Sequence, residues 1–598
     1  MYYDIVDVTQ LPLRHMSRRA SPLNTMDGTC IARSNAAGKA AIGMFWMSLC
    51  LSAIFATKPG VSWGQNEQTQ TSPIVETAEG PLRGLLRDGV YQFLGVPYAA
   101  APVGERRWMP PEPVTPWTPP FEATRFGQTC PQVTELGSFA GPTSVTEDCL
   151  YLNVFTSKLA REGAANAVLV WIHGGGNIDG ESNDYDATKL ATGGPLGTPI
   201  VVVTLNYRLG LFGFLAHPSL GSNGHPIANY GILDIQAALR WVKRNIRSFG
   251  GDPNRVALGG QSAGADNTAA NLVSPLAAGL FNRALFESGP VVEGIFRLSD
   301  GVAAGMAFAK AAGCPGEDAQ AAGCLRQLPV ARILQLQGTP KASGPYVTGP
   351  TVDGTIIPIP PESAYATGRF NRMPILGGNT ADELTFDSAI NEYFTDAPQA
   401  TRVALEHQSM LSRVFSAEVT REVLAEYPIS DYSSSQFAAS AAMTDYVSMC
   451  ASRHVVHSWS KFVPVYQYEF DYRDAPFYFP HMSGFAPLAA HTSDVQFLFK
   501  NWHGSILGVN LDQATGQPRE LNKPETQLSD RIVAFVTKFV STGNPNASGN
   551  FPWPRFTTQP GAPAILSENV PTLSRFTDAE FAAKHHCVFW GSILGFTD

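Results

Sequence analysis

The chain has few charged residues and no cluster of basic ones. Asp, Glu, Lys and Arg make up 16% of its 598 residues, whereas 44% are hydrophobic and 10% are aromatic. Disordered proteins show the reverse balance, because they lack the apolar side chains that a core requires. The net charge is −9, and no run of Lys or Arg forms a stripe that could bind phosphates. The composition therefore predicts a globular protein with a large core, and we do not expect nucleic acid as a partner.

Closely spaced cysteine pairs and sequence repeats are also missing. None of the eight cysteines forms a Cys-x-x-Cys pair, so we expect no zinc site. Gly and Pro are frequent, but they follow neither a Gly-X-Y period nor a proline repeat. After about residue 72 there is no low-complexity linker. Although the length alone would allow several domains, one large domain over residues 65–598 is the simplest interpretation.

A long uncharged stretch lies near the start of the chain. Residues 40–57 contain no Asp, Glu, Lys or Arg, and Arg33 and Lys39 precede them. A basic region followed by an apolar one is typical of a signal peptide. The small residues Ser62 and Gly64 predict cleavage after Gly64, so residues 1–64 would be an extension with a signal peptide and the mature protein secreted or periplasmic. An uncleaved N-terminal membrane anchor is the alternative, since the stretch approaches the length of a membrane span.

Apolar runs alternate with helical patterns along the rest of the chain. Strands are expected at residues 167–172, 199–205, 255–258, 373–376 and 463–470. Residues 230–249 repeat apolar side chains at helical spacing, and long helical insertions are expected at 300–345 and 385–460. Near-continuous apolar runs are typical of strands buried in a parallel sheet. The alternation predicts an α/β fold with a large, mostly parallel central sheet flanked by helices.

One of these strands is followed by a G-x-S-x-G motif. Gly260-Gln261-Ser262-Ala263-Gly264 stands between the strand at 255–258 and a helical run at 267–272. A serine on such a turn is lifted to the top of the sheet as a nucleophile, and the next backbone N–H, here that of Ala263, faces the developing oxyanion. The bare motif is common in a glycine-rich chain, so the strand and the helix around it carry this interpretation. An ordinary turn is the alternative.

A second glycine run follows the strand at 167–172. In His173-Gly174-Gly175-Gly176, three residues without side chains leave their backbone N–H groups open to an anion. This is the position at which hydrolases of this architecture place their other oxyanion donors, and such donors each contribute about 10²–10³ in rate. A flexible glycine turn is the alternative.

A serine nucleophile needs a base and a carboxylate that orients the base. In this architecture the chain order is serine, acid, histidine. Asp382 and Glu383 follow the strand at 373–376, and either could be the acid. Three histidines compete for the base, namely His481, His491 and His503. His491 is favoured because it stands just before an amphipathic run.

Taken together, these motifs resemble those of the type-B carboxylesterases, the α/β-hydrolase family that includes the cholinesterases. Residues 249–264 (FGGDPNRVALGGQSAG) are similar to the family's serine signature, and residues 147–154 (EDCLYLNV) are similar to its second signature. Shorter matches stand at residues 93–99, 206–208, 543–545 and 587–590. The resemblance therefore extends from about residue 73 to the C-terminus and implies an α/β-hydrolase fold with long helical insertions around the active site.

The resemblance also implies roles for individual residues. Ser262 would be the nucleophile, Glu383 the acid, and His491, three positions before Asp494, the base. The oxyanion hole would consist of the backbone N–H groups of Gly175, Gly176 and Ala263. The family pattern pairs the cysteines outside the N-terminal extension as Cys130–Cys149, Cys314–Cys324 and Cys450–Cys587, with free buried thiols as the alternative. Cys30 and Cys50 would be removed with the signal peptide.

Two departures from the family bear on the substrate. Gln261 stands before the nucleophile where cholinesterases carry Glu, and the segment between Cys130 and Cys149 lacks the Trp with which cholinesterases bind the choline cation. We therefore expect a small neutral carboxylic ester, hydrolysed through an acyl-enzyme, and no metal or organic cofactor is implied. The alternatives are a lipase acting on acylglycerols, with the Cys130–Cys149 loop as its lid, and a non-catalytic recognition module of the cholinesterase type.

Overall fold

The computed structural model describes residues 72–596 except 134–141, 160–162, 290–293, 339–346, 395–410, 413, 480–481, 483–484, 501, 503–508 and 547–550. The predictions for residues 1–64, which concern the signal peptide, its cleavage, the alternative anchor and the cysteines Cys30 and Cys50, lie outside this part of the chain. Within the described residues, no helix is both long enough and apolar enough to cross a membrane.

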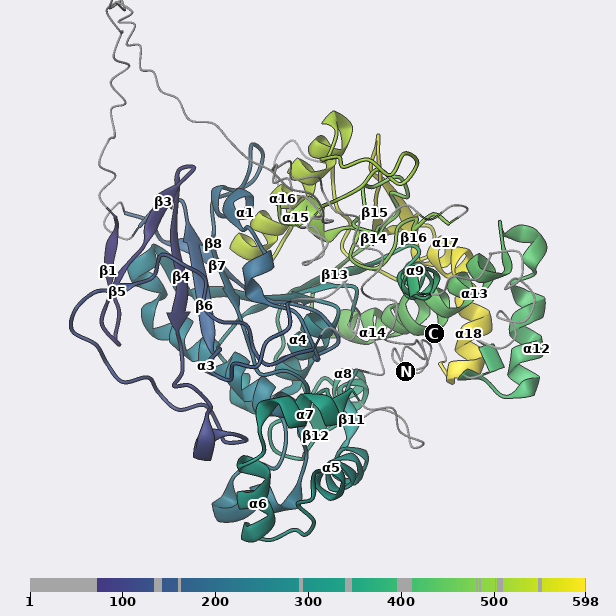
Figure 1. Ribbon diagram of the computed structural model, residues 1–598. Helices are drawn as coiled ribbons and strands as arrows, with labels where there is room; N and C mark the ends of the chain where they lie inside the picture. Colours follow the sequence, from purple (N-terminus) through teal and green to yellow (C-terminus); the bar gives the residue numbers. More distant parts are fainter. Residues whose placement is uncertain are drawn as a thin grey trace, which may run out of the picture. The chain divides into compact units, whose positions relative to one another are not determined.

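A large mixed sheet forms the centre of the fold (Figure 1). Its eleven strands have the order β16-β15-β14-β13-β10-β9-β7-β8-β6-β4-β3. The run from β15 to β8 is parallel throughout, whereas β6, β4 and β3 on one side and β16 on the other join it in antiparallel pairs. The predicted fold class, an α/β-hydrolase-like layout with a mostly parallel sheet, is therefore confirmed.

The strands of this sheet are β3 (Leu85–Arg87), β4 (Val90–Pro97), β6 (Tyr151–Thr156), β7 (Asn166–Ile172), β8 (Val201–Leu205), β9 (Gly251–Gln261), β10 (Arg283–Glu287), β13 (Ile375–Thr380), β14 (Val465–Phe470), β15 (Pro563–Glu568) and β16 (Ser574–Thr577). Two smaller sheets consist of β1 (Ile74–Glu76), β2 (Pro81–Arg83) and β5 (Phe121–Glu122), and of β11 (Phe296–Arg297) and β12 (Thr351–Val352). Strands β7 and β8 are buried along almost their whole length, as a parallel strand covered on both faces must be.

Helices flank the sheet and fill the insertions between its strands (Figure 1). They are α1 (Thr188–Thr192), α2 (Gly210–Phe214), α3 (Tyr230–Asn245), α4 (Ala263–Val273), α5 (Leu298–Ala312), α6 (Ala319–Arg326), α7 (Val330–Gln337), α8 (Pro361–Thr367), α9 (Thr385–Phe394), α12 (Ala417–Glu426), α13 (Ser435–Thr444), α14 (Cys450–Ser460), α15 (Val495–Leu498), α16 (Lys523–Thr542), α17 (Asp578–Lys584) and α18 (Cys587–Leu594). The helical insertions predicted at 300–345 and 385–460 correspond to α5–α7 and α9–α14.

Local sequence explains where the longer helices begin and end. The apolar positions Ile232, Ile235, Leu239 and Val242 form the buried face of α3, because side chains three or four residues apart share one side of a helix. Helix α16 begins with a capping box, in which the Asn522 side chain accepts from the Glu525 N–H while Glu525 accepts from the Asn522 N–H. It ends at Gly543, which adopts the left-handed conformation.

Two strands are longer than the apolar runs predicted. Strand β9 continues through Gly259 and Gly260 to Gln261, and β13 continues through Gly377 and Gly378 to Thr380. These glycines pair within the sheet, Gly260 with Phe286 and Gly378 with Tyr468. A methyl group at Gly378 would lie 2.2 Å from the Tyr468 carbonyl oxygen, so glycine here permits close packing instead of forming the turn that its presence suggests.

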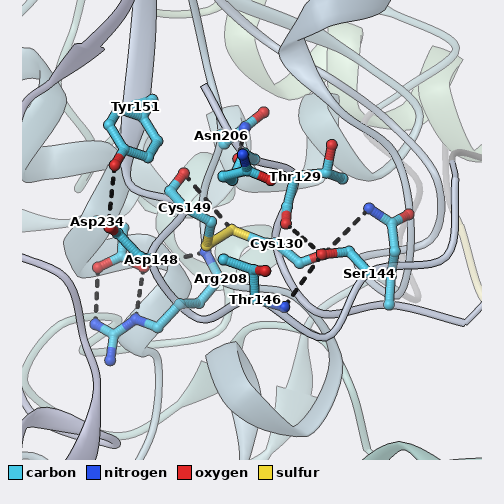
Figure 2. The surroundings of a disulfide bond; sticks show 12 residues. Thr129, Cys130, Ser144, Thr146, Asp148, Cys149, Tyr151, Asn206, Arg208 and Asp234 are labelled. Atoms are coloured by element: carbon cyan, nitrogen blue, oxygen red, sulfur yellow. Dashed lines mark hydrogen bonds and ion pairs between the residues drawn. A yellow bond between two sulfur atoms is a disulfide. The ribbon is translucent and has the colours of Figure 1, made fainter. Parts of the chain in front are cut away.

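The three disulfide bonds that the resemblance implies are present, at Cys130–Cys149, Cys314–Cys324 and Cys450–Cys587. Figure 2 shows the first of them beside the buried ion pair of Arg208 and Asp234, in which two guanidinium nitrogens each lie 2.7 Å from a carboxylate oxygen. Two of the segments that carry the resemblance meet here, since Cys149 belongs to the second signature at 147–154 and Arg208 to the shorter match at 206–208.

Candidate functional site

Ser262 occupies a strained turn between β9 and α4. Its φ is +57° and its ψ is −127°, a region that residues with a side chain rarely adopt. The Ser262 N–H donates to the Glu287 carbonyl oxygen at 2.9 Å, which fixes the turn to the end of β10. Ala263 is the first residue of α4, where a backbone N–H has no acceptor within the helix. This arrangement leaves that N–H available to an anion.

Glycine allows the helix and the neighbouring strand to approach closely at this turn. A methyl group at Gly264 would lie 2.2 Å from the carbonyl oxygen of Ile172, the last residue of β7. The loop that follows β7 also lies against the turn, since a methyl group at Gly174 would lie 3.0 Å from Ser262 Cβ. The predicted oxyanion loop and the predicted nucleophile are therefore direct neighbours.

Gly175 and Gly176 continue this loop with φ values of +97° and +59°. The Gly175 carbonyl oxygen accepts from the N–H groups of Ile178 and Asp179 at 3.0 and 3.1 Å. A methyl group at Gly175 would lie 2.3 Å from the Asp179 carbonyl oxygen. The loop is thus a tight, hydrogen-bonded turn, which fixes the direction of its backbone N–H groups.

Two adjacent carboxylates, Asp382 and Glu383, stand after β13, and they bind different partners. Glu383 is buried; its Oε1 accepts from the Thr380 N–H at 2.8 Å, and its Oε2 is hydrogen-bonded to His491 Nδ1. Asp382 instead pairs with Arg473, with 2.8 Å between its Oδ2 and the arginine Nε. Of the two candidates for the acid, Glu383 is therefore the one in contact with a histidine.

His491 lies in the segment after β14, three residues before Asp494, and is buried. Its backbone N–H donates to the Glu383 carbonyl oxygen at 3.2 Å, and its ring packs edge-on against Phe386. At the other ring nitrogen, Nε2, the structure records a contact of 3.1 Å with the side-chain nitrogen of Gln261. Because Gln261 directly precedes Ser262, this contact brings the histidine to the serine turn. The competing His481 and His503 lie outside the described residues.

Burial and charge act on the pKa of His491 in opposite directions. Burial disfavours the imidazolium and lowers the pKa, but the Glu383 carboxylate and its hydrogen bond raise it, as do Asp387 and Asp494, and the net shift is upward. For His173, at the start of the glycine loop, no carboxylate among the described residues offsets the effect of burial. Burial lowers its pKa to about 4, so this imidazole is neutral near pH 7.

A group of buried carboxyls that the sequence did not reveal lies beside these residues. Glu287, Asp494 and Glu568 line one small cavity together with Tyr468, whose hydroxyl donates to Asp494 Oδ2 at 3.0 Å. Within the described residues, Glu287 Oε2 and Asp494 Oδ1 have no hydrogen-bond partner. Burial and the charge of Glu383 raise the pKa of Asp494 to about 6. Burial and the charges of Asp494 and Glu568 raise the pKa of Glu287 well above its ordinary value.

The described residues contain no group of three or more His, Cys, Asp and Glu side chains that could hold a metal ion. The sequence identified Gln261 only as a departure from the cholinesterase pattern, and its contact with His491 was not predicted. Asp387 and Glu287 were also missed. The only signal in the sequence for Asp387 is its place four residues after Glu383, at helical spacing in the first turn of α9.

The fold and this constellation define a class of protein. A mostly parallel sheet, a serine on a strained strand-to-helix turn, a glycine loop beside it and a carboxylate–histidine pair after later strands are the arrangement of an α/β-hydrolase. Comparison with known proteins narrows the class. The model of the carboxylesterase family matches residues 71–590, and the chain belongs to that family.

Relatives of known activity support this assignment. The chain is 32% identical to the acylcarnitine hydrolase of Mus musculus, over 82% of this chain and 86% of that protein. It is 32% identical to the para-nitrobenzyl esterase of Bacillus subtilis (strain 168), over 84% and 96%. A solved structure of a thermophilic PNB esterase superposes with a TM-score of 0.69 at 30% identity, covering 86% of this chain and all of that one. The predicted class, a carboxylic ester hydrolase, is confirmed, and the lipase alternative is not favoured.

Proposed function

We propose that the chain hydrolyses neutral carboxylic esters in two steps through an acyl-enzyme on Ser262. His491 Nε2 takes the Ser262 proton as the hydroxyl attacks the ester carbonyl. Glu383 holds the proton on Nδ1 and stabilises the imidazolium that forms. The backbone N–H groups of Gly175, Gly176 and Ala263 bind the oxyanion of the tetrahedral intermediate. The alcohol leaves with the proton from His491, and water then releases the acid by the same route.

The observation that carries this proposal is the pair of contacts that His491 makes. Its Nδ1 is hydrogen-bonded to the buried Glu383 carboxylate, and its Nε2 lies beside Gln261, the residue before the serine. A neutral imidazole with its proton on Nδ1 has its lone pair on Nε2, the atom that must accept the serine proton. Hydrogen bonds to the nucleophile are often incomplete when a site is empty and tighten with substrate.

Charge near the serine supports a neutral substrate. Gln261 carries no charge where a carboxylate would attract a cation, and the nearby Glu383 is engaged by His491. Burying an unpaired cation in such a site is costly. We therefore expect a neutral ester to be hydrolysed with a higher kcat/KM than a choline ester that has the same acyl group.

We also propose that residues 1–64 direct export and are removed, which leaves a mature protein of one domain from residue 65. The uncharged run at 40–57 behind Arg33 and Lys39 supports a signal peptide. The three disulfides support an oxidising compartment, because disulfides persist outside the cytosol and are rare within it.

The mechanism is tested by removing the nucleophile. We expect Ser262→Ala to lose at least about 10³-fold in kcat toward p-nitrophenyl butyrate, because the attacking oxygen is absent while binding is retained. An organophosphonate should label Ser262 in the wild type with a stoichiometry near one. Full esterase activity in the folded Ser262→Ala protein, or labelling at another residue, would contradict the proposal. Circular dichroism of the variant controls for its folding.

A further inference from the structure

The Gln261 side chain contacts Nε2 of His491, the atom that accepts the serine proton in the proposed mechanism. The Gln261 side-chain nitrogen lies 3.1 Å from His491 Nε2, and the exposed fractions of the two residues are only 2% and 5%. Gln261 is the last residue of β9, where backbone pairing with Glu287 fixes its position. The contact therefore joins two well-placed side chains in a site from which bulk water is largely excluded.

The direction of this hydrogen bond follows from the other side of the ring. His491 Nδ1 faces the Glu383 carboxylate, which can only accept, so the ring proton is on Nδ1. In the neutral ring, Nε2 then carries a lone pair and can only accept. The Gln261 amide supplies the donor through its NH₂ group. A doubly protonated ring would instead direct an N–H at this NH₂ group, which is repulsive, so the contact is favourable only for the neutral imidazole.

We propose that Gln261 is a positioning residue that binds the Nε2 lone pair of His491 and stabilises the neutral base. This inference rests on the proposed function, because it requires His491 to act as the base for Ser262. The amide and the serine hydroxyl compete for one lone pair, so the Gln261 bond must break before the proton is transferred. The amide thus extends activity to lower pH, and it slows proton transfer at high pH.

Other groups near the His491 ring also affect its pKa. Glu383 from the turn after β13, Asp387 from α9 and Asp494 at the start of α15 all favour the imidazolium. The Phe386 ring covers one edge and carries no charge. Gln261 acts in the opposite direction, because its NH₂ group donates to the neutral ring. Its removal should therefore shift the titration upward.

The test compares the pH dependence of kcat/KM for p-nitrophenyl butyrate in the wild type, Gln261→Met and Gln261→Glu. Methionine keeps the size of the side chain but cannot donate. We expect the acid limb of Gln261→Met to move up by about 0.7 pH unit, the equivalent of one ordinary hydrogen bond. Activity on that limb should then fall about fivefold, whereas kcat on the alkaline plateau should equal or exceed that of the wild type. Gln261→Glu should move the limb by about 1 unit or more, because a carboxylate favours the imidazolium directly.

Gln236→Met is the matched control, since Gln236 on α3 is also buried and its Nε2 donates to Oγ of Ser274, the residue that follows α4. It should leave the acid limb unchanged. An unchanged or lowered acid limb in Gln261→Met would overturn the inference, and so would an acid limb in Gln261→Glu that does not move up. The second variant keeps the test valid if the first does not fold.

Organophosphonate labelling separates the two proposals. If Ser262 of the wild type is not labelled, the proposed function fails. If all variants are labelled equally but share one acid limb, only the role of Gln261 fails.

Discussion

Neighbouring carboxylates at positions 382 and 383 show how much one peptide unit changes the environment of a side chain. Glu383 points into the protein toward His491, whereas Asp382 points to Arg473, whose side chain is 51% exposed, and accepts from the Ala489 N–H. Burial raises the pKa of Asp382, and Arg473 opposes that shift. One carboxylate therefore contacts His491, and the other connects the turn after β13 to the segment before His491.

This difference gives a matched pair of variants. We expect Glu383→Gln to lose about 10⁴-fold in kcat, because an amide can donate to Nδ1 and so favours the wrong tautomer of the histidine. Asp382→Asn should stay within about tenfold of the wild type, since it removes a partly exposed ion pair, and such pairs contribute little. Steady-state kinetics on one ester decides between them. Equal losses in both variants would contradict the assignment of the acid.

Sequence pattern could reach Ser262 and the glycine loop, because strand, turn and helix follow one another along the chain there. Without the family resemblance it could not choose between Asp382 and Glu383, and it favoured His491 over His481 and His503 without excluding them. The Gln261–His491 contact depends on two rotamers and on the distance between segments 230 residues apart in the chain. No local periodicity records such a distance, so the structure was needed to find it.

Among the predicted strands, the ends of β9 and β13, which precede Ser262 and Glu383, were predicted least accurately. Apolar runs predicted the centre of β9 but only the start of β13, and both strands extend into pairs of glycines, which are more typical of turns. A methyl group added at Gly260 would lie 2.5 Å from the Gly264 backbone, so the strand and the helix are in direct contact there. Close packing of backbone against backbone sets the position of Ser262. The glycines in the sequence indicate such close packing, but they do not distinguish a turn from an extended strand.

The proposed role of residues 1–64 in export is supported by the sequence alone. When the full chain is expressed in a Gram-negative host, we expect the periplasmic protein to begin at Gln65, because a signal peptidase cleaves after small residues such as Ser62 and Gly64. N-terminal sequencing measures this directly. Leu51→Arg should block export by placing a charge in the apolar run. Recovery of the full-length chain in the membrane fraction would support the anchor instead.

On the scale of the whole molecule, the pairing order of the sheet brings distant carboxyls together. Glu287 ends β10, Glu568 ends β15, and Asp494 precedes α15, yet all three line the same cavity. Burial, followed by the charge of Asp494, raises the pKa values of Glu287 and Glu568 well above their ordinary value. No spacing in the sequence predicts this cluster, because it arises from the order of the strands in the sheet. The proposed mechanism gives Glu287 and Glu568 no role, so their effect should appear in stability.

The pH dependence of that stability has a definite sign. A carboxyl whose pKa is raised on folding binds its proton more tightly in the folded than in the unfolded chain. Its contribution to the free energy of unfolding is fully present below the pKa that the group has in the unfolded chain, near 4.3 for Glu. That contribution is lost as the pH rises toward the pKa that the group has in the folded chain. Glu287→Gln keeps the shape of the protonated side chain and cannot ionise, so we expect its melting temperature to match that of the wild type near pH 4 and to exceed it at pH 8. Glu422→Gln, an exposed position on α12, should match the wild type at both. A Glu287→Gln protein no more stable than the wild type at pH 8 would mean that the buried carboxyls do not strain the fold.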